Sequence, residues 1–161
     1  MNSDSHYEIG SSHKVCQDYA IHGNYNSAQY VIISDGCSSS KDVDIGARIL
    51  CHTVKSAIEE IMDIACSNGD WYQLIIEPLT EFIKEYVLRK SREITNNLNL
   101  HLESLDATVI LAIKDNDKTY LICWGDGGYV LTKKNGIIEY STIEYESGAP
   151  YYLSYELNSV R

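Results

Sequence analysis

Residues 29–36 read Gln-Tyr-Val-Ile-Ile-Ser-Asp-Gly, an apolar run that ends abruptly at Asp35-Gly36. A continuous apolar run bounded by turn residues predicts a strand, here over residues 29–34, that is buried on both faces. Residues 18–23 predict a second strand, and the turn-forming segment 23–27 between the two predicts a hairpin. The second strand of this hairpin therefore ends at an aspartate, Asp35.

Two helical segments follow the hairpin. Residues 45–66 have a helical period, with Asp42 or Asp44 as the cap, Asn68-Gly69 as the stop, and an apolar stripe made of Leu50, Val54, Ala57, Ile58, Ile61, Met62 and Ala65. Residues 71–98 predict a second helix, with Pro78 in a break or a first turn. Both helices are amphipathic, so each must cover another layer.

The strand period then returns in residues 107–113, 119–124, 128–132 and 137–140. Short turn segments at 114–118 and 133–136 join these strands, which predicts antiparallel pairing. Strands, two long helices and again strands predict an α+β fold, in which the helices lie on antiparallel sheets.

Composition limits the function. The chain of 161 residues corresponds to one domain, residues 1–161, with a net charge of −10 that disfavours nucleic acid as a partner. It has no apolar run of membrane-spanning length and no signal-peptide pattern, which predicts a protein away from membranes. Its five cysteines lack metal-site or disulfide spacing, which favours a reducing compartment, the cytoplasm.

Three aspartates share one local context. Asp18 opens a strand, Asp35 closes the most apolar strand, and Asp126 lies in the turn Gly125-Asp126-Gly127. A carboxylate beside glycine can present side-chain and carbonyl oxygens together, the ligands that Mg²⁺ and Mn²⁺ prefer. Asp-Gly is also a common turn dipeptide, so the residues alone leave a structural role open.

Other phosphate chemistries lack their motifs. The positions six residues after the cysteines hold no arginine, which argues against a cysteine-based phosphatase, and no cysteine is expected to be catalytic. The chain has neither a nucleophile elbow nor a glycine-rich phosphate loop. Residues 115–126 fail the calcium-loop pattern, because its sixth position holds Tyr120 and its twelfth holds Asp126.

Four segments lie in a fixed order, with the two predicted helices between the second and the third. They are residues 12–18 (SHKVCQD), 31–40 with 44–48 (VIISDGCSSS, DIGAR), 106–112 (DATVILA) and 125–131 (GDGGYVL). In this order they resemble the metal-dependent serine/threonine protein phosphatases of the type 2C class, above all a bacterial subgroup. The resemblance spans residues 10–153.

The resemblance implies a fold and a site. The fold is a layered α-β-β-α sandwich of antiparallel sheets flanked by helices. Asp35 would bridge two metal ions, the Gly36 carbonyl would bind one of them, and Asp18 would hold metal-bound water. Asp126 matches an aspartate of a third, weaker metal position. The implied cofactors are Mn²⁺ or Mg²⁺, two or three ions in the full-length enzyme.

The sequence also departs from the family pattern. The phosphate-binding arginine of the family falls on His13, and an imidazole is a weaker phosphate clamp than a guanidinium. The two further metal-binding aspartates of the family have no counterpart after Asp126. We therefore expect the chain to be the N-terminal portion of a longer phosphatase domain, with a fold that is incomplete at the C-terminus.

These patterns lead to two hypotheses. The first is a protein serine/threonine phosphatase that, as a full-length protein, hydrolyses phosphoproteins with metal-activated water, with Asp18 and Asp35 as catalytic residues and His13 as the phosphate contact; the present chain is expected to bind metal incompletely and to have little activity. The alternative is a catalytically inactive, phosphatase-like binding or regulatory domain, which His13 and the missing aspartates favour. An unfinished sheet with an exposed edge would also allow a homodimer.

Overall fold

The structure is a computed structural model that describes residues 3–26, 28–68, 76–115, 118–146, 148 and 150–157. It contains a four-stranded antiparallel sheet in the order β1-β2-β3-β4 and a separate hairpin, β5-β6. The strands are β1 (Asp18–Tyr25), β2 (Ala28–Asp35), β3 (Val109–Asp115), β4 (Lys118–Trp124), β5 (Gly127–Thr132) and β6 (Ile138–Ile143). The predicted α+β fold with antiparallel sheets is confirmed.

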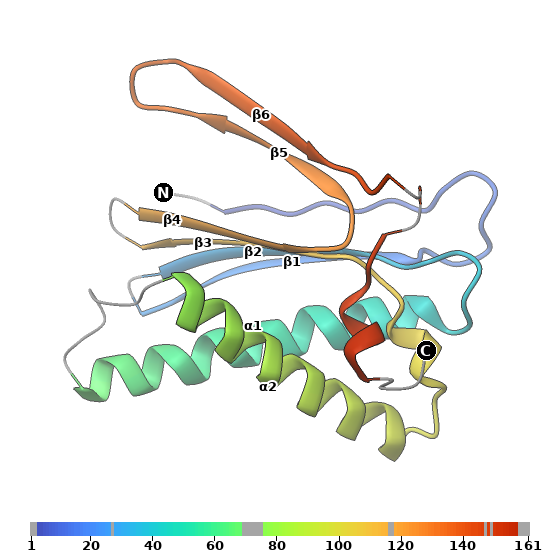
Figure 1. The fold of residues 1–161 in the computed structure, drawn as a ribbon. Helices are drawn as coiled ribbons and strands as arrows, with labels where there is room; N and C mark the ends of the chain where they lie inside the picture. The colour runs from blue at the N-terminus through green and yellow to red at the C-terminus, as the bar shows by residue number, and fades with distance from the viewer. Residues whose placement is uncertain are drawn as a thin grey trace.

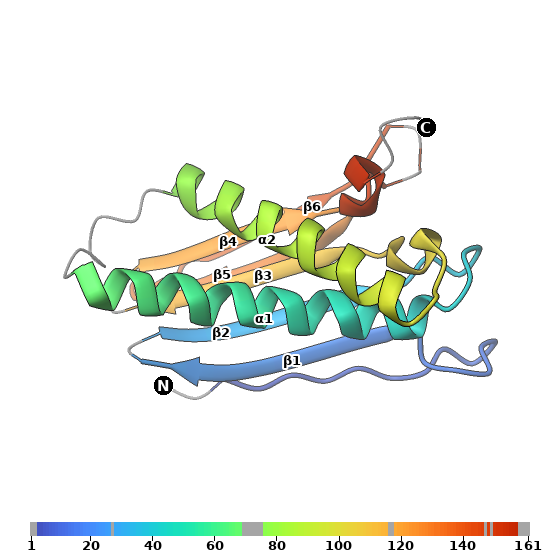
Figure 2. The same ribbon diagram turned by 90° about the horizontal axis from the view of Figure 1, so that it is seen from below.

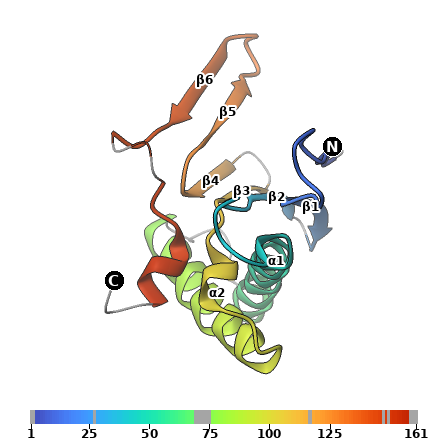
Figure 3. The same cartoon turned by 90° about the vertical axis from the view of Figure 1, so that its right-hand side faces the viewer.

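Two long helices cover one face of the four-stranded sheet. Helix α1 (Val43–Asn68) contacts β1 and β2, and α2 (Ile76–Asn97) packs beside α1, on the side of β4 (Figure 2). The β5-β6 hairpin stands over the opposite face of the sheet, so the layers are helices, sheet and hairpin (Figures 1 and 3). Two short 3-10 helices, η2 (Leu102–Leu105) and η3 (Leu153–Leu157), complete the fold near one end of the sheet.

The helix predictions agree with the structure where it can be compared. Pro78 lies in the first turn of α2, where a missing N–H costs little. Residues 71–75, the predicted start of that helix, lie outside the described residues, as do residue 27 and residues 116 and 117 of two predicted turns. No described helix combines the length and apolar character needed to cross a bilayer.

The core lies between the sheet and the helices. Alternate residues of β2 point toward α1, and Ile32 is fully buried there. Ile58 and Leu50 of α1 and Leu111 of β3 are similarly buried and belong to the same cluster. The described part of the apolar stripe that the sequence predicted for the first helix, from Leu50 to Met62, therefore lies in this core.

The prediction that the second strand is buried on both faces is wrong. Its burial alternates, and Ile33, which points away from the helices, is 39% exposed. The reason is the position of the β5-β6 hairpin, which rises away from this face toward its tip (Figure 1). The apolar run reflects a central strand with only one fully covered face.

Helix α1 begins close to η2. The Asp42 carbonyl accepts hydrogen bonds from the N–H groups of Ile45 and Gly46, each 3.1 Å long, which form the first turn. A Cβ atom at Gly46 would lie 1.6 Å from the Ser104 carbonyl oxygen, so only glycine fits at this position. This close packing fixes the start of α1 against the segment that leads into β3.

Candidate active site

The ends of β1 and β2 bring two of the predicted site residues together. Asp18, the first residue of β1, and Asp35, the last residue of β2, are direct register partners in the antiparallel pair. Directly opposed residues point to the same face. Their side chains share a hydrogen bond on the face away from the helices.

The segment before β3 holds the end of β2 in place. The Asp35 N–H donates to Thr108 Oγ1 at 3.0 Å, and the Thr108 N–H donates to the Asp35 carbonyl at 2.9 Å. The next residue, Gly36, donates its N–H to the Gln17 carbonyl at 3.2 Å. The predicted strand 107–113 begins late, at Val109, because the Asp35 N–H bonds the Thr108 side chain instead of a backbone carbonyl; Ala107 keeps the same register only as an isolated bridge to Gly36.

A glycine-rich turn places the third aspartate. Gly125 and Gly127 have φ angles of +93° and +147°, which residues with a side chain rarely adopt. A Cβ atom at Gly125 would lie 2.9 Å from Thr108 Cγ2, so the turn packs closely on the residue that holds Asp35. The charge of Asp126 therefore acts on Asp35.

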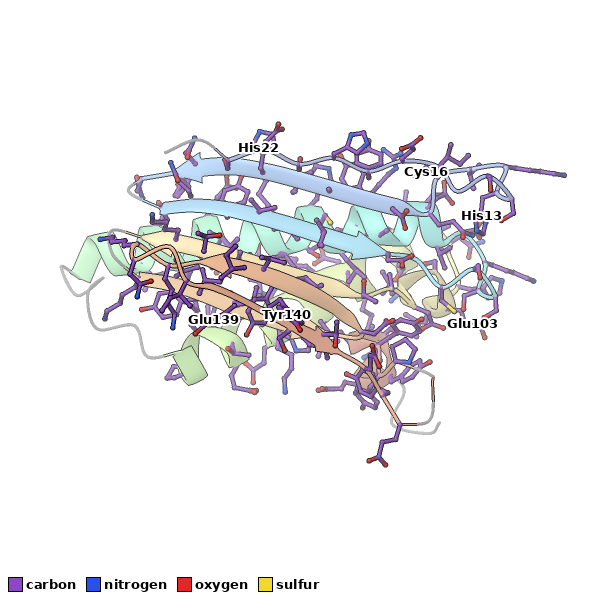
Figure 4. The ribbon with its side chains drawn as sticks, turned by 90° about the horizontal axis from the view of Figure 1, so that it is seen from above. His13, Cys16, His22, Glu103, Glu139 and Tyr140 are labelled. Carbon is purple, nitrogen blue, oxygen red and sulfur yellow. The ribbon has the colours of Figure 1, made fainter. Side chains whose placement is uncertain are left out.

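A hollow of about 430 Å³ contains every residue that the sequence singled out for the site. The chain segment before β1 carries His13 to the end of the sheet where β1 begins and β2 ends (Figure 4). The hollow is lined by His13, Asp18, Asp35, Gly36 and Asp126, together with Gly10, Gln17, Cys37, Ser38, Thr108, Pro150 and Tyr152. A second hollow, of about 330 Å³, adjoins it and shares Asp18, Asp35, Thr108 and Asp126.

The carboxylates of the hollow affect one another. Burial, the hydrogen bond with Asp18 and the charges of Asp18 and Asp126 raise the pKa of Asp35 to about 6, while His13 acts in the opposite direction. Each of the raising effects disfavours a negative charge at Asp35. A cation in the hollow would reverse this balance and favour the ionised carboxylate.

The oxygen atoms that line the hollow suit a hard divalent cation. The carboxylates of Asp18, Asp35 and Asp126 and the Gly36 carbonyl supply oxygen only, which suits Mg²⁺ or Mn²⁺. In the part of the chain that the structure describes, no three side chains of His, Cys, Asp or Glu converge closely enough to hold a metal by themselves. The residues fit one side of such a site, with the remaining ligands supplied by water or substrate.

Several residues of this region escaped the sequence analysis. Asp106 is buried at 6% exposure, and its carboxylate accepts hydrogen bonds from Ser154 Oγ at 2.6 Å and Ser40 Oγ at 3.1 Å. Its carbonyl accepts the N–H of Cys37 at 2.8 Å. The sequence offered little indication of this role for Asp106, because the segment 106–108 looks like the start of an ordinary strand.

Comparison with known proteins decides the family. A family model described as Protein phosphatase 2C matches residues 4–147, most of the chain. The chain belongs to the protein phosphatase 2C family. The matched range includes every predicted site residue of this phosphatase-family chain, whereas η3 lies beyond it. A comparison with curated proteins gave no significant match.

Proposed function

We propose that the chain acts as a metal-dependent protein serine/threonine phosphatase of a bacterial type, with its centre in the 430 Å³ hollow. The observation that supports this most strongly is the convergence of Asp18, Asp35 and Asp126 from three separate segments on one hollow. Membership of the protein phosphatase 2C family supplies the reaction class, the hydrolysis of phosphoproteins.

The residues have distinct roles in this proposal. Asp35 and the Gly36 carbonyl would hold Mn²⁺ or Mg²⁺, and Asp126 would serve a neighbouring metal position. When bound, such ions neutralise phosphate oxygens and lower the pKa of water. Asp18, beside Asp35, would orient the attacking water through its carboxylate.

His13, which also lines the hollow, would contact the phosphate. Its imidazole can donate one hydrogen bond when neutral and two when protonated. A protonated ring would also attract a phosphate electrostatically. Since a single imidazole cannot form the paired hydrogen bonds of a guanidinium, we expect it to bind the substrate phosphate weakly.

A second candidate function is a phosphatase-like domain that binds without hydrolysis. Two observations favour it: His13 at the phosphate position, and the lack of a three-ligand cluster among the described side chains. Such a domain would bind a phosphoprotein or a regulatory partner through the same hollow. The two candidates differ in turnover, which can be measured directly.

The deciding experiment is hydrolysis of p-nitrophenyl phosphate and of a phosphothreonine peptide by the purified chain with Mn²⁺. Turnover that a chelator abolishes and that Asp35→Asn reduces at least 100-fold would support the phosphatase. The exposed helix variant Glu85→Gln is the matched control and should keep full activity. Peptide binding without turnover would favour the binding domain, and equal turnover by Asp35→Asn and the parent chain would contradict the metal-site proposal.

The cellular setting is also part of this proposal. Phosphoproteins would be the partners, and the cytoplasm would be the location, since Cys16, Cys37, Cys51 and Cys123 are free thiols. A homodimer through an exposed sheet edge is a separate proposal that does not depend on catalysis.

A further inference from the structure

The chain returns to the hollow after β6, in residues 150–157. This segment lies beyond residues 4–147, which the family model matches. Its first part supplies Pro150 and Tyr152 to the lining of the 430 Å³ hollow. Its last part, η3, packs against α2 and η2 (Figure 3). Part of the wall around the three aspartates therefore comes from a segment that the family resemblance does not describe.

Packing and hydrogen bonds hold this segment in place. Leu153 and Leu157 are buried and belong to the main core cluster. Between them, Ser154 Oγ donates to the buried carboxylate of Asp106 at 2.6 Å. At the end of η3, the Arg92 guanidinium of α2 donates to the Leu157 carbonyl. The residue that precedes Leu153 is therefore carried on a fixed element and has a defined position in the hollow wall.

That residue is Tyr152, and its hydroxyl end lies at the hollow. The hydroxyl shares a hydrogen bond with the Cys37 thiol, and the charge of Asp126 acts on it. Both Cys37 and Asp126 line the hollow. The Tyr152 ring packs edge-on against the Tyr155 ring, with the ring centroids 5.5 Å apart. The side chain is only 7% exposed, so its orientation is set by these neighbours.

The chemistry of this hydroxyl suits an anionic ligand. Burial, the hydrogen bond with Cys37 and nearby charges raise the pKa of Tyr152 above its ordinary value, so the phenol keeps its proton at neutral pH. A neutral phenol donates a hydrogen bond and adds no negative charge to a wall that already carries Asp18, Asp35 and Asp126. It is therefore a donor that a phosphate can approach without further repulsion.

We propose, on the basis of the function proposed above, that Tyr152 is a substrate-contacting residue whose hydroxyl donates a hydrogen bond to a phosphate oxygen in the hollow. In the structure this hydroxyl is bonded to the Cys37 thiol. A thiol is a weak hydrogen-bond acceptor, whereas a phosphate oxygen is charged and accepts strongly, so the exchange favours the phosphate. Tyr152 would thus supplement His13, whose imidazole donates a single hydrogen bond when neutral.

Tyr152→Phe tests the proposal, because it removes the hydroxyl and keeps the ring. We expect KM for p-nitrophenyl phosphate with Mn²⁺ to rise about tenfold and kcat to change little, as for the loss of a hydrogen bond to a charged group of the bound substrate. Affinity for a phosphothreonine peptide, measured by fluorescence anisotropy, should also fall about tenfold. The matched control is Tyr151→Phe, a 50% exposed neighbour outside the hollow lining, which should leave KM and affinity unchanged.

Cys37→Ala separates a phosphate contact from a purely structural role of the hydroxyl. It removes the thiol that bonds Tyr152 but keeps the hydroxyl, so KM and peptide affinity should not worsen; losses equal to those of Tyr152→Phe would overturn the proposal.

Two other results would also overturn the proposal. One is unchanged KM and affinity in a Tyr152→Phe variant that circular dichroism shows to be folded. The other is a parent chain that neither hydrolyses p-nitrophenyl phosphate nor binds the phosphopeptide, which would contradict the proposed function as well. A parent chain without turnover, whose peptide binding Tyr152→Phe still weakens, would contradict the phosphatase alone and support the contact.

Discussion

Asp18 and Asp35 are direct register partners at the ends of β1 and β2, and their carboxyl groups share a hydrogen bond. Two carboxyl groups can share a hydrogen bond only while one of them is protonated. Burial, this bond and the charges of Asp18 and Asp126 raise the pKa of Asp35 to about 6. A cation in the hollow would relieve this repulsion, and without one the crowded carboxyl groups lower the stability of the folded chain.

Metal-free stability should depend on pH through Asp35. Because folding raises its pKa from 3.8 to about 6, its stabilising contribution is complete below about pH 4 and is lost as the pH rises through 6. At pH 7, Asp35→Asn should raise the free energy of unfolding by about 1 kcal/mol, a value reduced for partial exposure. Urea titrations in chelator measure it.

The gain from Asp35→Asn should vanish at pH 4, where the parent carboxyl group is largely protonated. The control variant Glu85→Gln, on the exposed side of α2, should leave the free energy of unfolding at pH 7 nearly unchanged. An Asp35→Asn variant that is less stable than the parent chain at pH 7 would show that the carboxylate is not strained by its neighbours.

Divalent metal should bind the chain weakly. A tight Mn²⁺ site gains affinity from several fixed carboxylates among about six oxygen ligands, whereas here Asp35 and the Gly36 carbonyl would supply the protein oxygens. Calorimetric titration should give a dissociation constant well above the micromolar range, and Asp35→Asn should remove the signal. A submicromolar site would mean that these residues form a complete metal centre.

Cys37 should affect access to the hollow without taking part in hydrolysis. Burial acts to raise the pKa of its thiol, but hydrogen bonds with Ser39 and Tyr152 outweigh burial and lower that pKa. We expect iodoacetamide to block the hollow at Cys37, and Cys37→Ser to keep Mn²⁺-dependent turnover and resist the reagent. Complete loss of turnover in Cys37→Ser, with the fold intact, would instead indicate thiol chemistry.

The bond between Ser154 and Asp106 should stabilise the fold. Ser154→Ala removes a 2.6 Å donor from a carboxylate that is 6% exposed, so we expect the free energy of unfolding to fall by about 1–3 kcal/mol. Chemical denaturation measures this loss. Ser38→Ala, at an exposed position of the neighbouring loop, is the control and should change it little. Equal stability of the two variants would mean that η3 contributes nothing through this contact.

Gly46→Ala should have two opposing effects on stability, a gain from helix propensity and a loss from a steric clash. Alanine favours a helix over glycine by about 1 kcal/mol, but its Cβ would lie 1.6 Å from the Ser104 carbonyl oxygen. We expect overall destabilisation by several kcal/mol, since backbone must move. Gly148→Ala, where φ is +69° and no atom lies within 4 Å of the added Cβ, should cost only about 1–2 kcal/mol. Thermal melts compare the two.

The local pattern of apolar and turn-forming residues was enough to predict most of the helices and strands. The helical period of residues 45–66 and the alternation in residues 119–124 reflect which side chains must be buried, and the structure has α1 and β4 there. The Asp-Gly turns also marked where strands end. The error at Ile33 arose because an apolar run does not reveal whether a second layer will cover its outer face.

The five site residues could be chosen from sequence because their motifs resemble those of a family, yet nothing local places them together. Register decides that Asp18 faces Asp35, and positive φ angles at Gly125 and Gly127 turn Asp126 toward them. The contacts of Asp106 with Ser40 and Ser154 join residues up to 66 positions apart. Hydrophobic periodicity and turn-forming residues involve only a few neighbouring positions, so they can be recognised in the sequence. Which charged side chains become neighbours across strands depends on how the whole chain packs.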